Sequence, residues 1–375
     1  MKRLWSILIS LLLALSFTAG ACADPTVLTP DMGLELSEEV IAGLAEKNPE
    51  AEGISPLTGL PSEEPYTPIT LVLDSSPECM PQWGVAEADW IVQVPLRRDG
   101  DTRMVAVYGS EYPEQAGAVR SGRMTTLPIA NLFRGAAVMA GWPPNAEQDI
   151  SVEYWLEDWD YNKPIRYYNL LGKKYRERVD FLPEPQNLSA HIQEIHASLV
   201  KRETKFEKRF FQFADEPLTG GDAAASIRFQ FFNRPTEDDE IAARKNGTEP
   251  APEVSKESLS SACTFSYEEG VGYTRDSNTG IFTDRNTGEA VRFANVVVLR
   301  SPLEWIGDYP YYHNHLKTCG QMELFQNGRH VTGAWYRAGR LSRLVLLDGE
   351  GKEIPLQRGK TWMVIGDEYT VVSYE

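Results

Sequence analysis

Short, continuous apolar runs separated by turn-forming residues fill the sequence from about residue 56 onward. Segments with helical spacing alternate with them, one after Gly117–Arg123 and another at NLSAHIQEIHASLVKRETKF. Strands that alternate with helices predict a mixed α/β module with a central sheet over residues 55–221. The predicted strands are the β-branched and aromatic runs Ile69–Asp74, Asp89–Val94, Met104–Gly109 and Ala136–Gly141.

Hairpin patterns dominate the second half. TGAWYR (Thr332–Arg337) follows a QNG turn after QMELF. The same pattern of apolar strand segments separated by turn residues continues in RLVLLDGEGKEIPL and KTWMVIG. The near-repeat RDSNTG and TDRNTG, starting at Arg275 and Thr283, indicates two successive hairpin turns. We expect a predominantly antiparallel β module over residues 222–375, with a charged, exposed insertion or flexible loop at 235–258. The expected fold class is therefore α+β, with the mixed α/β module first.

The N-terminus has the pattern of a secretory leader. Lys2 and Arg3 precede an apolar run from Leu4 to Phe17, which is too short to span a bilayer, and small residues follow before Cys22. Residues 1–21 are predicted to be a signal peptide. Residues 22–54 are predicted to be a tether, in which LELSEEVIAGLAEK is the one segment suited to a short helix.

Cys22 is the expected lipidation site. AGAC resembles a bacterial lipobox with Ala19 in the usual place of leucine, whereas ACA before Asp24 also suits ordinary signal peptidase. Two alternatives therefore remain. The protein is either secreted, or anchored on the outer face of the membrane through a diacylated cysteine. The other cysteines are Cys79, Cys263 and Cys319, an odd number that cannot pair completely. We expect buried thiols, with a single disulfide between two of them as the alternative.

The charge balance limits the partners of the protein. The chain carries a net charge of −17, and removal of the leader with its two positive charges would make it −19. Such a balance disfavours nucleic acid or anionic lipid as the partner of the surface as a whole. A local basic site for an anion remains compatible with it.

GAVRSGR (Gly117–Arg123) is the most informative short stretch in this respect. It lies between a predicted strand and a predicted helix, with Ser121 as the expected N-cap. Free N–H groups at a helix start, together with the guanidinium groups of Arg120 and Arg123, would suit a carboxylate, phosphate or sulfate. Asp74, Asp89 and Arg103 lie at predicted strand ends, where they join the candidate site at the rim of one sheet; solvated ion pairs are the alternative.

Two further groups have weaker support. His313, His315 and Cys319 contain potential zinc ligands, but the set is incomplete, so we expect ordinary histidines and no metal or other cofactor. An acidic, aromatic segment suits sugar binding or a glycosidase carboxylate pair, with core packing as the favoured interpretation. Its members are Glu153, Tyr154, Trp155, Glu157, Asp158, Trp159, Asp160, Tyr161, Tyr167 and Tyr168. The sequence contains no Gly-x-Ser-x-Gly, His-Glu-x-x-His, phosphate-loop or dinucleotide motif.

Several stretches, in order along nearly the whole mature chain, resemble the YerB-like family of bacterial lipoproteins, domain of unknown function 3048, which has N- and C-terminal modules. They are SPLTGLP, ITLVLDSS, PQWGVAEADWIV, GDTRMVAVY, AGAVRSGR, RNTGEAVRFANVVVL, FQNGRHVTGAWYR and LQRGKTWMVI. The resemblance implies a cell-envelope location and a two-module build, and it implies no activity.

Comparison with the family pattern also shows where this chain departs from it. Met80 replaces an arginine of the family pattern, Gln93 replaces a glutamate, and Met139 replaces a histidine. The stretch QNLS, which starts at Gln186, replaces His-Asn-Leu-Tyr. The six candidate residues at the rim all match: Asp74, Asp89, Arg103, Arg120, Ser121 and Arg123. Because potential acids and bases are lost while anion donors remain, the departures favour binding over catalysis.

We therefore expect a non-catalytic binding or accessory protein of the bacterial cell envelope that recognises an anionic group. Its expected partners are the membrane, through the N-terminal lipid, and peptidoglycan or another envelope component or protein, with no nucleic acid. The alternative is a cell-wall polymer hydrolase that uses paired carboxylates.

Overall fold

The computed structural model describes residues 25–28, 35–37, 39, 52–144, 151–157, 166–231, 237–248, 256–305, 311–314, 316, 318–367 and 370–375. The predicted leader, Cys22 and most of the tether lie outside these ranges. The helices are η2 (Pro77–Cys79), α3 (Leu127–Phe133), α4 (Val152–Glu157), α6 (Ile192–Lys201), α7 (Glu237–Asn246) and α8 (Lys256–Ser261). No helix among the described residues is long and apolar enough to cross a bilayer.

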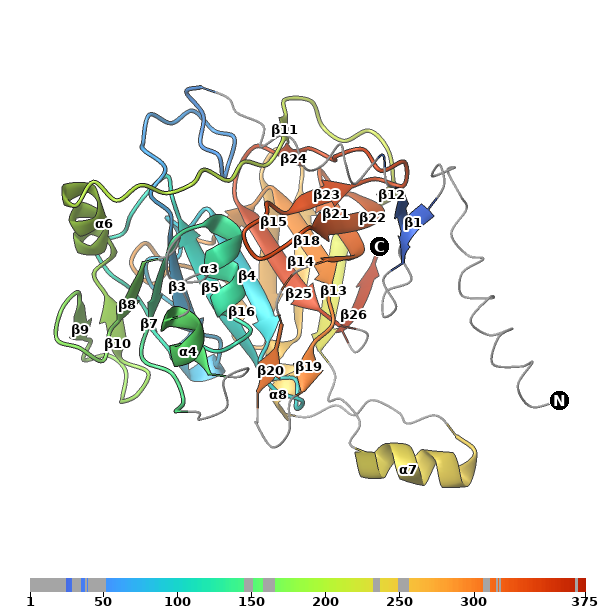
Figure 1. The fold of residues 1–375 in the computed structure, drawn as a ribbon, viewed down its shortest axis with the longest axis horizontal. Coiled ribbons are helices and arrows are strands. Elements are labelled where there is room, and N and C mark those ends of the chain that lie inside the picture. Colours follow the sequence, from blue (N-terminus) through green and yellow to red (C-terminus); the bar gives the residue numbers. More distant parts are fainter. Residues whose placement is uncertain are drawn as a thin grey trace.

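One eleven-stranded sheet forms the centre of the molecule (Figure 1). The order along it is β12-β22-β21-β18-β25-β4-β5-β3-β7-β8, and β23 pairs with β22. The strands from the first half of the chain are β3 (Ile69–Asp74), β4 (Trp90–Pro95), β5 (Thr102–Tyr108), β7 (Ala136–Met139) and β8 (Tyr167–Asn169). Those from the second half are β12 (Asp222–Ala223), β18 (Asn295–Arg300), β21 (Thr318–Gln326), β22 (Arg329–Arg337), β23 (Val345–Leu347) and β25 (Thr361–Gly366).

The two halves are joined within this sheet, because β25 pairs in parallel with β4, with Thr361 opposite Trp90. A division of the chain at residue 221 therefore cuts through one continuous sheet. In the first half, β5 is antiparallel to β3 and β4, whereas β7 is parallel to β3 and β8. In the second half antiparallel pairs predominate. The α+β prediction is confirmed.

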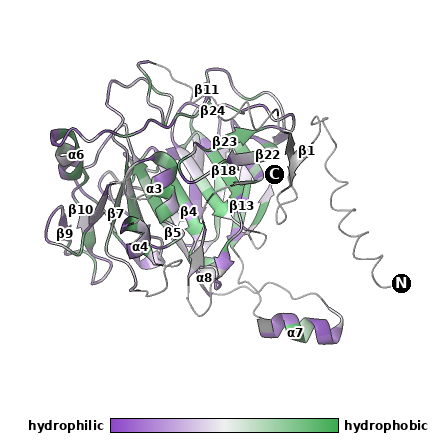
Figure 2. Cartoon of the chain, in the orientation of Figure 1, coloured by the Kyte–Doolittle hydropathy of each residue, from purple (hydrophilic) through white to green (hydrophobic). Residues whose placement is uncertain are grey.

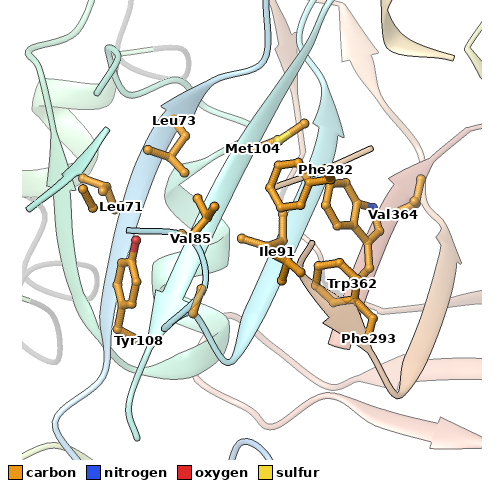
Figure 3. Packing of buried hydrophobic residues seen from close by; sticks show 14 of the residues in the cluster. Leu71, Leu73, Val85, Ile91, Met104, Tyr108, Phe282, Phe293, Trp362 and Val364 are labelled. Atoms are coloured by element: carbon orange, nitrogen blue, oxygen red, sulfur yellow. The ribbon is translucent and has the colours of Figure 1, made fainter. Parts of the chain in front are cut away.

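Apolar residues cover both faces of the central sheet, because alternate residues of a strand point to opposite sides. Trp90 and Val92 of β4 pack on one face with α3 and α4, and Ile91 packs on the other. On that second face, Ile91 lies beside Trp362 and Val364 of β25 (Figure 3). The core thus crosses from one half of the chain to the other on both faces.

A six-stranded antiparallel sheet contributes to the second core. Its Phe229 and Phe265 pack edge to face with rings 5.6 Å apart, and Phe265 also contacts Trp362. The strands are β13 (Ser226–Phe231), β14 (Cys263–Glu268), β15 (Gly272–Ser277), β16 (Gly280–Ile281), β17 (Arg292–Phe293) and β26 (Thr370–Tyr374). Hydrophobic strands fill the interior, while α7 is largely hydrophilic (Figure 2).

The remaining strands form small sheets around the core. A three-stranded sheet has the order β6-β10-β9, and the pairs are β1–β2, β11–β24 and β19–β20. Their bounds are β1 Pro25–Leu28, β2 Glu35–Ser37, β6 Ala116–Gly117, β9 Arg176–Arg178, β10 Leu188–Ala190, β11 Phe213–Ala214, β19 Glu304–Trp305, β20 Tyr312–His313 and β24 Leu356–Gln357.

Several local predictions can be compared with the structure. The predicted insertion contains the helix α7, so the loop interpretation is wrong over Glu237–Asn246, and most residues of α7 are exposed. The suggested tether helix is wrong at its start, where Glu35–Ser37 is strand β2 paired with β1. The three cysteines described are free and buried, as expected: Cys79, Cys263 and Cys319.

Candidate functional site

The segment Val119–Gly122 is inserted between the ends of β3 and β7. These strands pair in parallel as far as Leu71 and Val138 and then separate. The amide of Arg120 donates to the carbonyl of Val72 at 2.9 Å, and the Arg120 carbonyl accepts from the amide of Ala140 at 2.9 Å. Arg120 is therefore fixed on both sides at the carboxyl ends of two parallel strands, a common location for ligand sites in α/β sheets.

Both glycines of GAVRSGR, Gly117 before this segment and Gly122 at its end, are closely packed. A Cβ atom on Gly117 would lie 2.1 Å from the ring of Trp83, and one on Gly122 would lie 2.3 Å from Sδ of Met139. The glycines of GAVRSGR thus allow the chain to pass between the strand ends. They do not form a loop around a phosphate.

The predicted helix start at Ser121 is wrong. Helix α3 begins at Leu127 with Thr126 at the N-cap position and no side-chain cap. The Ser121 hydroxyl donates to the carbonyl of Ala140 at 2.9 Å, because residue 121 is part of the extended segment between the strands. Ser121 therefore does not cap a helix, and the free N–H groups expected at a helix start do not lie at this residue.

Two arginines share one buried carboxylate at the edge of the sheet. Asp74 ends β3 and lies opposite Arg103 of β5. One carboxylate oxygen, Oδ1, is 3.2 Å from Nη1 of Arg103, and the other, Oδ2, is 2.8 Å from Nε of Arg120. The backbone amide of Ser76 also donates to Asp74 Oδ1 at 3.1 Å. The structure thus brings Asp74, Arg103 and Arg120 together, as the sequence predicted.

The environment keeps this carboxylate ionised. Burial by itself would raise the pKa of Asp74, but the charges of Arg103 and Arg120 and the hydrogen bonds from Ser76 outweigh it and hold the pKa below its usual value. Burial lowers the pKa of Arg103, while Asp74 opposes that effect. A guanidinium group nonetheless stays protonated in a protein. The trio of Asp74, Arg103 and Arg120 therefore has a net charge of +1.

Arg123 adds a further positive charge beside the trio. Its charge is one of those that lower the pKa of Arg103, after burial. Its described contacts are to uncharged groups: it donates to the carbonyl of Gly122 at 2.9 Å and to the hydroxyl of Tyr311 at 3.3 Å, and it lies 4.3 Å from the centre of the Tyr311 ring. We call Asp74, Arg103, Arg120 and Arg123 the arginine cluster.

Arg120 is the most exposed member of the arginine cluster. Its side chain is 28% exposed, whereas that of Arg103 is 7% exposed. Asp74 contacts Arg120 through Nε, and no described residue accepts a hydrogen bond from either terminal nitrogen of Arg120. The Nε of Arg103 is buried and also has no hydrogen-bond partner among the described residues. Unused donors of this kind are suited to an oxyanion.

Asp89 lies elsewhere. It precedes β4, and its amide donates to the carbonyl of Val107, near the far end of β5 from Arg103. The strand register places Asp89 opposite Tyr108, five residues along β5 from Arg103, which corresponds to roughly 17 Å. The prediction that Asp89 shares one rim with Asp74 is wrong, because β4 runs antiparallel to β5, so its start lies at the opposite edge.

Burial raises the pKa of Asp89 to about 6, against the opposing effects of Lys360 and of the hydrogen bonds at Ser110. Since the folded state holds this proton more tightly than the unfolded state, the protein loses stability as pH rises from about 4 to 6. We expect Asp89→Asn to stabilise the protein by about 2–3 kcal/mol at pH 7 and to leave it unchanged below pH 4. Urea unfolding at both pH values tests this, and equal stabilities at pH 7 would contradict it.

The weaker candidates do not form a second site in the described part of the chain. Cys319 packs in a small apolar cluster, His313 lies on β20, and His315 lies outside the described residues. Searched over the described residues, no group of three or more potential ligands is arranged to hold a metal. In the aromatic segment, Trp155 packs in the core and under Arg340, as the core interpretation predicted. Asp158, Trp159, Asp160 and Tyr161 lie outside the described residues.

Two neighbours of the arginine cluster were not identified from the sequence. Gln82 donates through Nε2 to the backbone carbonyl of Asp74, and Tyr311 covers Arg123. Gln82 lies within the stretch PQWGVAEADWIV, but nothing in its local pattern indicates this contact. Tyr311 is 188 positions from Arg123, and only the fold brings them together.

The fold is that of an α+β protein in which both halves of the chain contribute strands to one mixed sheet. A buried aspartate–arginine group lies at the strand ends in the part of this sheet that the first half forms. The chain belongs to the family described as "Protein of unknown function (DUF3048)". The N-terminal domain of that family matches residues 57–205, and the C-terminal domain matches residues 254–363.

The chain is similar to "Putative lipoprotein YerB" of Bacillus subtilis (strain 168). The two are 25% identical over 321 residues, which is 83% of this chain and 85% of YerB. The crystal structure of the Bacillus subtilis YerB protein has the same fold, with a TM-score of 0.66 and 23% identity, over 85% of this chain and 99% of that one. These similarities are consistent with the lipoprotein class and indicate no ligand or activity.

Proposed function

We propose that the protein is a binding or accessory protein of the bacterial cell envelope, anchored outside the membrane by lipid on Cys22, that recognises an anionic group through the arginine cluster. A carboxylate or phosphate of peptidoglycan, another wall polymer or an envelope protein is the expected class of ligand. The observation that carries the proposal is the ion pair between Arg120 Nε and Asp74, which leaves the two terminal nitrogens of Arg120 without an acceptor among the described residues.

The geometry at Arg120 supports binding in three ways. A buried carboxylate orients the guanidinium group, which lowers the entropy lost when a ligand binds. The two remaining nitrogens form a fork that matches a carboxylate or phosphate. The cluster of three arginines and one aspartate also has a positive charge in a chain whose net charge is −17, so an anion is favoured there over the rest of the surface.

The hydrolase alternative has less support from the described residues. A glycosidase needs two carboxylates about 5–10 Å apart. Asp74 and Asp89 are roughly 17 Å apart along the sheet. Asp74 is also ion-paired to two arginines, which suits neither a general acid nor a free nucleophile.

Substitution of Arg120 tests the binding proposal. We expect Arg120→Ala to weaken the binding of inorganic phosphate or acetate by about 1.5–3 kcal/mol, because a charged hydrogen-bonding pair is lost. Arg120→Lys keeps the charge without the fork and should give an intermediate affinity. Titration calorimetry on the full chain measures both.

Arg178 offers a matched control, because Glu184 also contacts it through Nε, at 3.2 Å, at an exposed position outside the cluster. Arg178→Ala should leave the affinity unchanged. If Arg120→Ala and Arg178→Ala bind the probes equally well, Arg120 has no role in recognition. The anchor is tested separately: the Cys22→Ala chain should be released into the medium, and its retention on the membrane would count against lipidation.

A further inference from the structure

A second surface of the molecule has a charge opposite to that of the chain as a whole. Residues 166–209 contain ten lysines or arginines and six acidic residues, whereas the full chain has a net charge of −17. This segment forms β8, β9, β10 and α6, and Figure 1 shows β9, β10 and α6 together at one end of the molecule. We call its cations the basic face: Arg166, Lys173, Lys174, Arg176, Lys201 and Arg202.

Contacts between the elements bring these cations together. The hydroxyl of Tyr175, between Lys174 and Arg176, donates to Ser198 on α6 at 3.1 Å. Burial raises the pKa of the Tyr168 hydroxyl, and the nearby charges of Arg202 and Arg166 lower it, so both cations lie close to the same phenol. The rings of Tyr168 and Tyr175 are 5.5 Å apart. No cation of the basic face forms an ion pair within the part of the chain that the structure describes.

Exposed apolar side chains lie among these charges. Leu171 is 61% exposed and Val200 is 50% exposed. Tyr167, also partly exposed, packs edge to face against Trp142 with ring centres 6.1 Å apart. Lysine and arginine beside an aliphatic tip and paired Tyr and Trp rings are the composition found at the water–lipid boundary of a bilayer.

The loop that carries Leu171 is held rigidly. The side-chain oxygen of Asn169 accepts hydrogen bonds from the amides of Leu171 and Gly141, both at 3.0 Å. The amide of Leu170 donates to the carbonyl of Met139 at the end of β7, at 2.8 Å. The backbone of the exposed Leu171 is therefore fixed to the central sheet. Binding through this residue would cost little conformational entropy, because its loop is already ordered.

We propose that the basic face docks the protein on the surface of an anionic phospholipid bilayer, with Leu171 inserted at the headgroup level. Cations near such a surface are attracted to it, and the remainder of this acidic protein is repelled by it, so the two effects together select one orientation. The exposed apolar residues favour a bilayer over a soluble polyanion, which offers them no apolar environment. This inference goes beyond the proposed function, because it uses different residues and adds a direct contact between the folded protein and the bilayer surface.

An environment-sensitive fluorophore on Leu171→Cys tests the proposal in the full chain reconstituted into vesicles. We expect blue-shifted emission with 30% phosphatidylglycerol in phosphatidylcholine, and no shift with pure phosphatidylcholine or at high salt. Val371→Cys is the matched control, since Val371 is an exposed aliphatic residue on β26. The chain without an added cysteine, labelled in the same way, gives the background.

Charge reversal provides a second variant that leaves the core unchanged. Lys173→Glu with Lys174→Glu should reduce the inserted fraction by about tenfold or more. The same change at the adjacent pair Arg244 and Lys245 on α7 should have no effect. Equal shifts in both kinds of vesicle, or at positions 171 and 371, would overturn the proposal. It would also be overturned if polyphosphate, and neither vesicle, altered the emission, because the partner would then be a polyanionic polymer.

Discussion

Asp74→Asn is expected to destabilise the protein by about 3–5 kcal/mol at pH 7. The substitution keeps the shape of the side chain and removes the only negative charge in contact with Arg103 and Arg120 among the described residues. Arg103 is 6% exposed, so its charge would stay buried without its ion-pair partner, with the charge of Asp101 still nearby. Such a loss is a large share of the stability of a typical protein, about 5–15 kcal/mol. Urea unfolding followed by circular dichroism measures it.

The more exposed pair of Arg97 and Asp99, with side chains 39% and 35% exposed, is a matched control, because its nitrogen–oxygen distance is also 3.2 Å. Asp99→Asn should cost at most about 1 kcal/mol, since solvent screens an exposed ion pair. A folded-state pKa below the usual 3.8 means that the Asp74 pair stabilises the protein above about pH 4, and that this contribution is lost as pH falls further. The difference between wild type and Asp74→Asn should therefore shrink in acid. Equal costs for the two variants would show that burial does not determine the effect.

The strands were the most predictable part of the fold. The predicted strand Ile69–Asp74 matches β3 residue for residue, and the strand predicted at Asp89 begins one residue later. Every residue of β3, β4 and β5 is buried, so most of each strand is an apolar run, and the polar exceptions are few: Thr70, Asp74, Gln93, Thr102 and Arg103. The connection between the halves was not predictable, because parallel pairing of β4 with β25 joins positions about 270 residues apart and leaves no local pattern.

The candidate site was predicted in part for the same reason. Asp74 and Arg103 were correctly grouped because each lies at a strand end, and β3 and β5 are antiparallel neighbours. Asp89 satisfies the same local criterion but lies at the other edge, since strand direction decides the edge and a single strand does not reveal it. Ser121 has the residue type of an N-cap, yet pairing of its segment with β3 and β7 outweighs that local preference.

The second half of the near-repeat, TDRNTG, contains a contact that its turn pattern does not predict. Asp284 is fully buried, and its Oδ2 accepts hydrogen bonds from the amides of Val85 and Ala86 at 2.6 and 2.8 Å. Its Oδ1 accepts from the amide of Asn286 at 2.7 Å. Arg285 reinforces the contact, since its amide donates to the carbonyl of Gln82. One carboxylate thus connects a turn of the second half of the chain to a loop of the first.

Asp284→Ala is therefore expected to destabilise the protein by about 3–5 kcal/mol, because it leaves the amides of buried Val85 and half-buried Ala86 without this acceptor, at about 1–3 kcal/mol each, and removes a turn contact. The repeat itself supplies the control. Asp276 occupies the corresponding position in RDSNTG and is exposed, so Asp276→Ala should change stability by less than about 0.5 kcal/mol. Urea unfolding of both variants measures the difference. Similar stabilities would mean that the β25–β4 pairing and the shared core hold the two halves together without this contact.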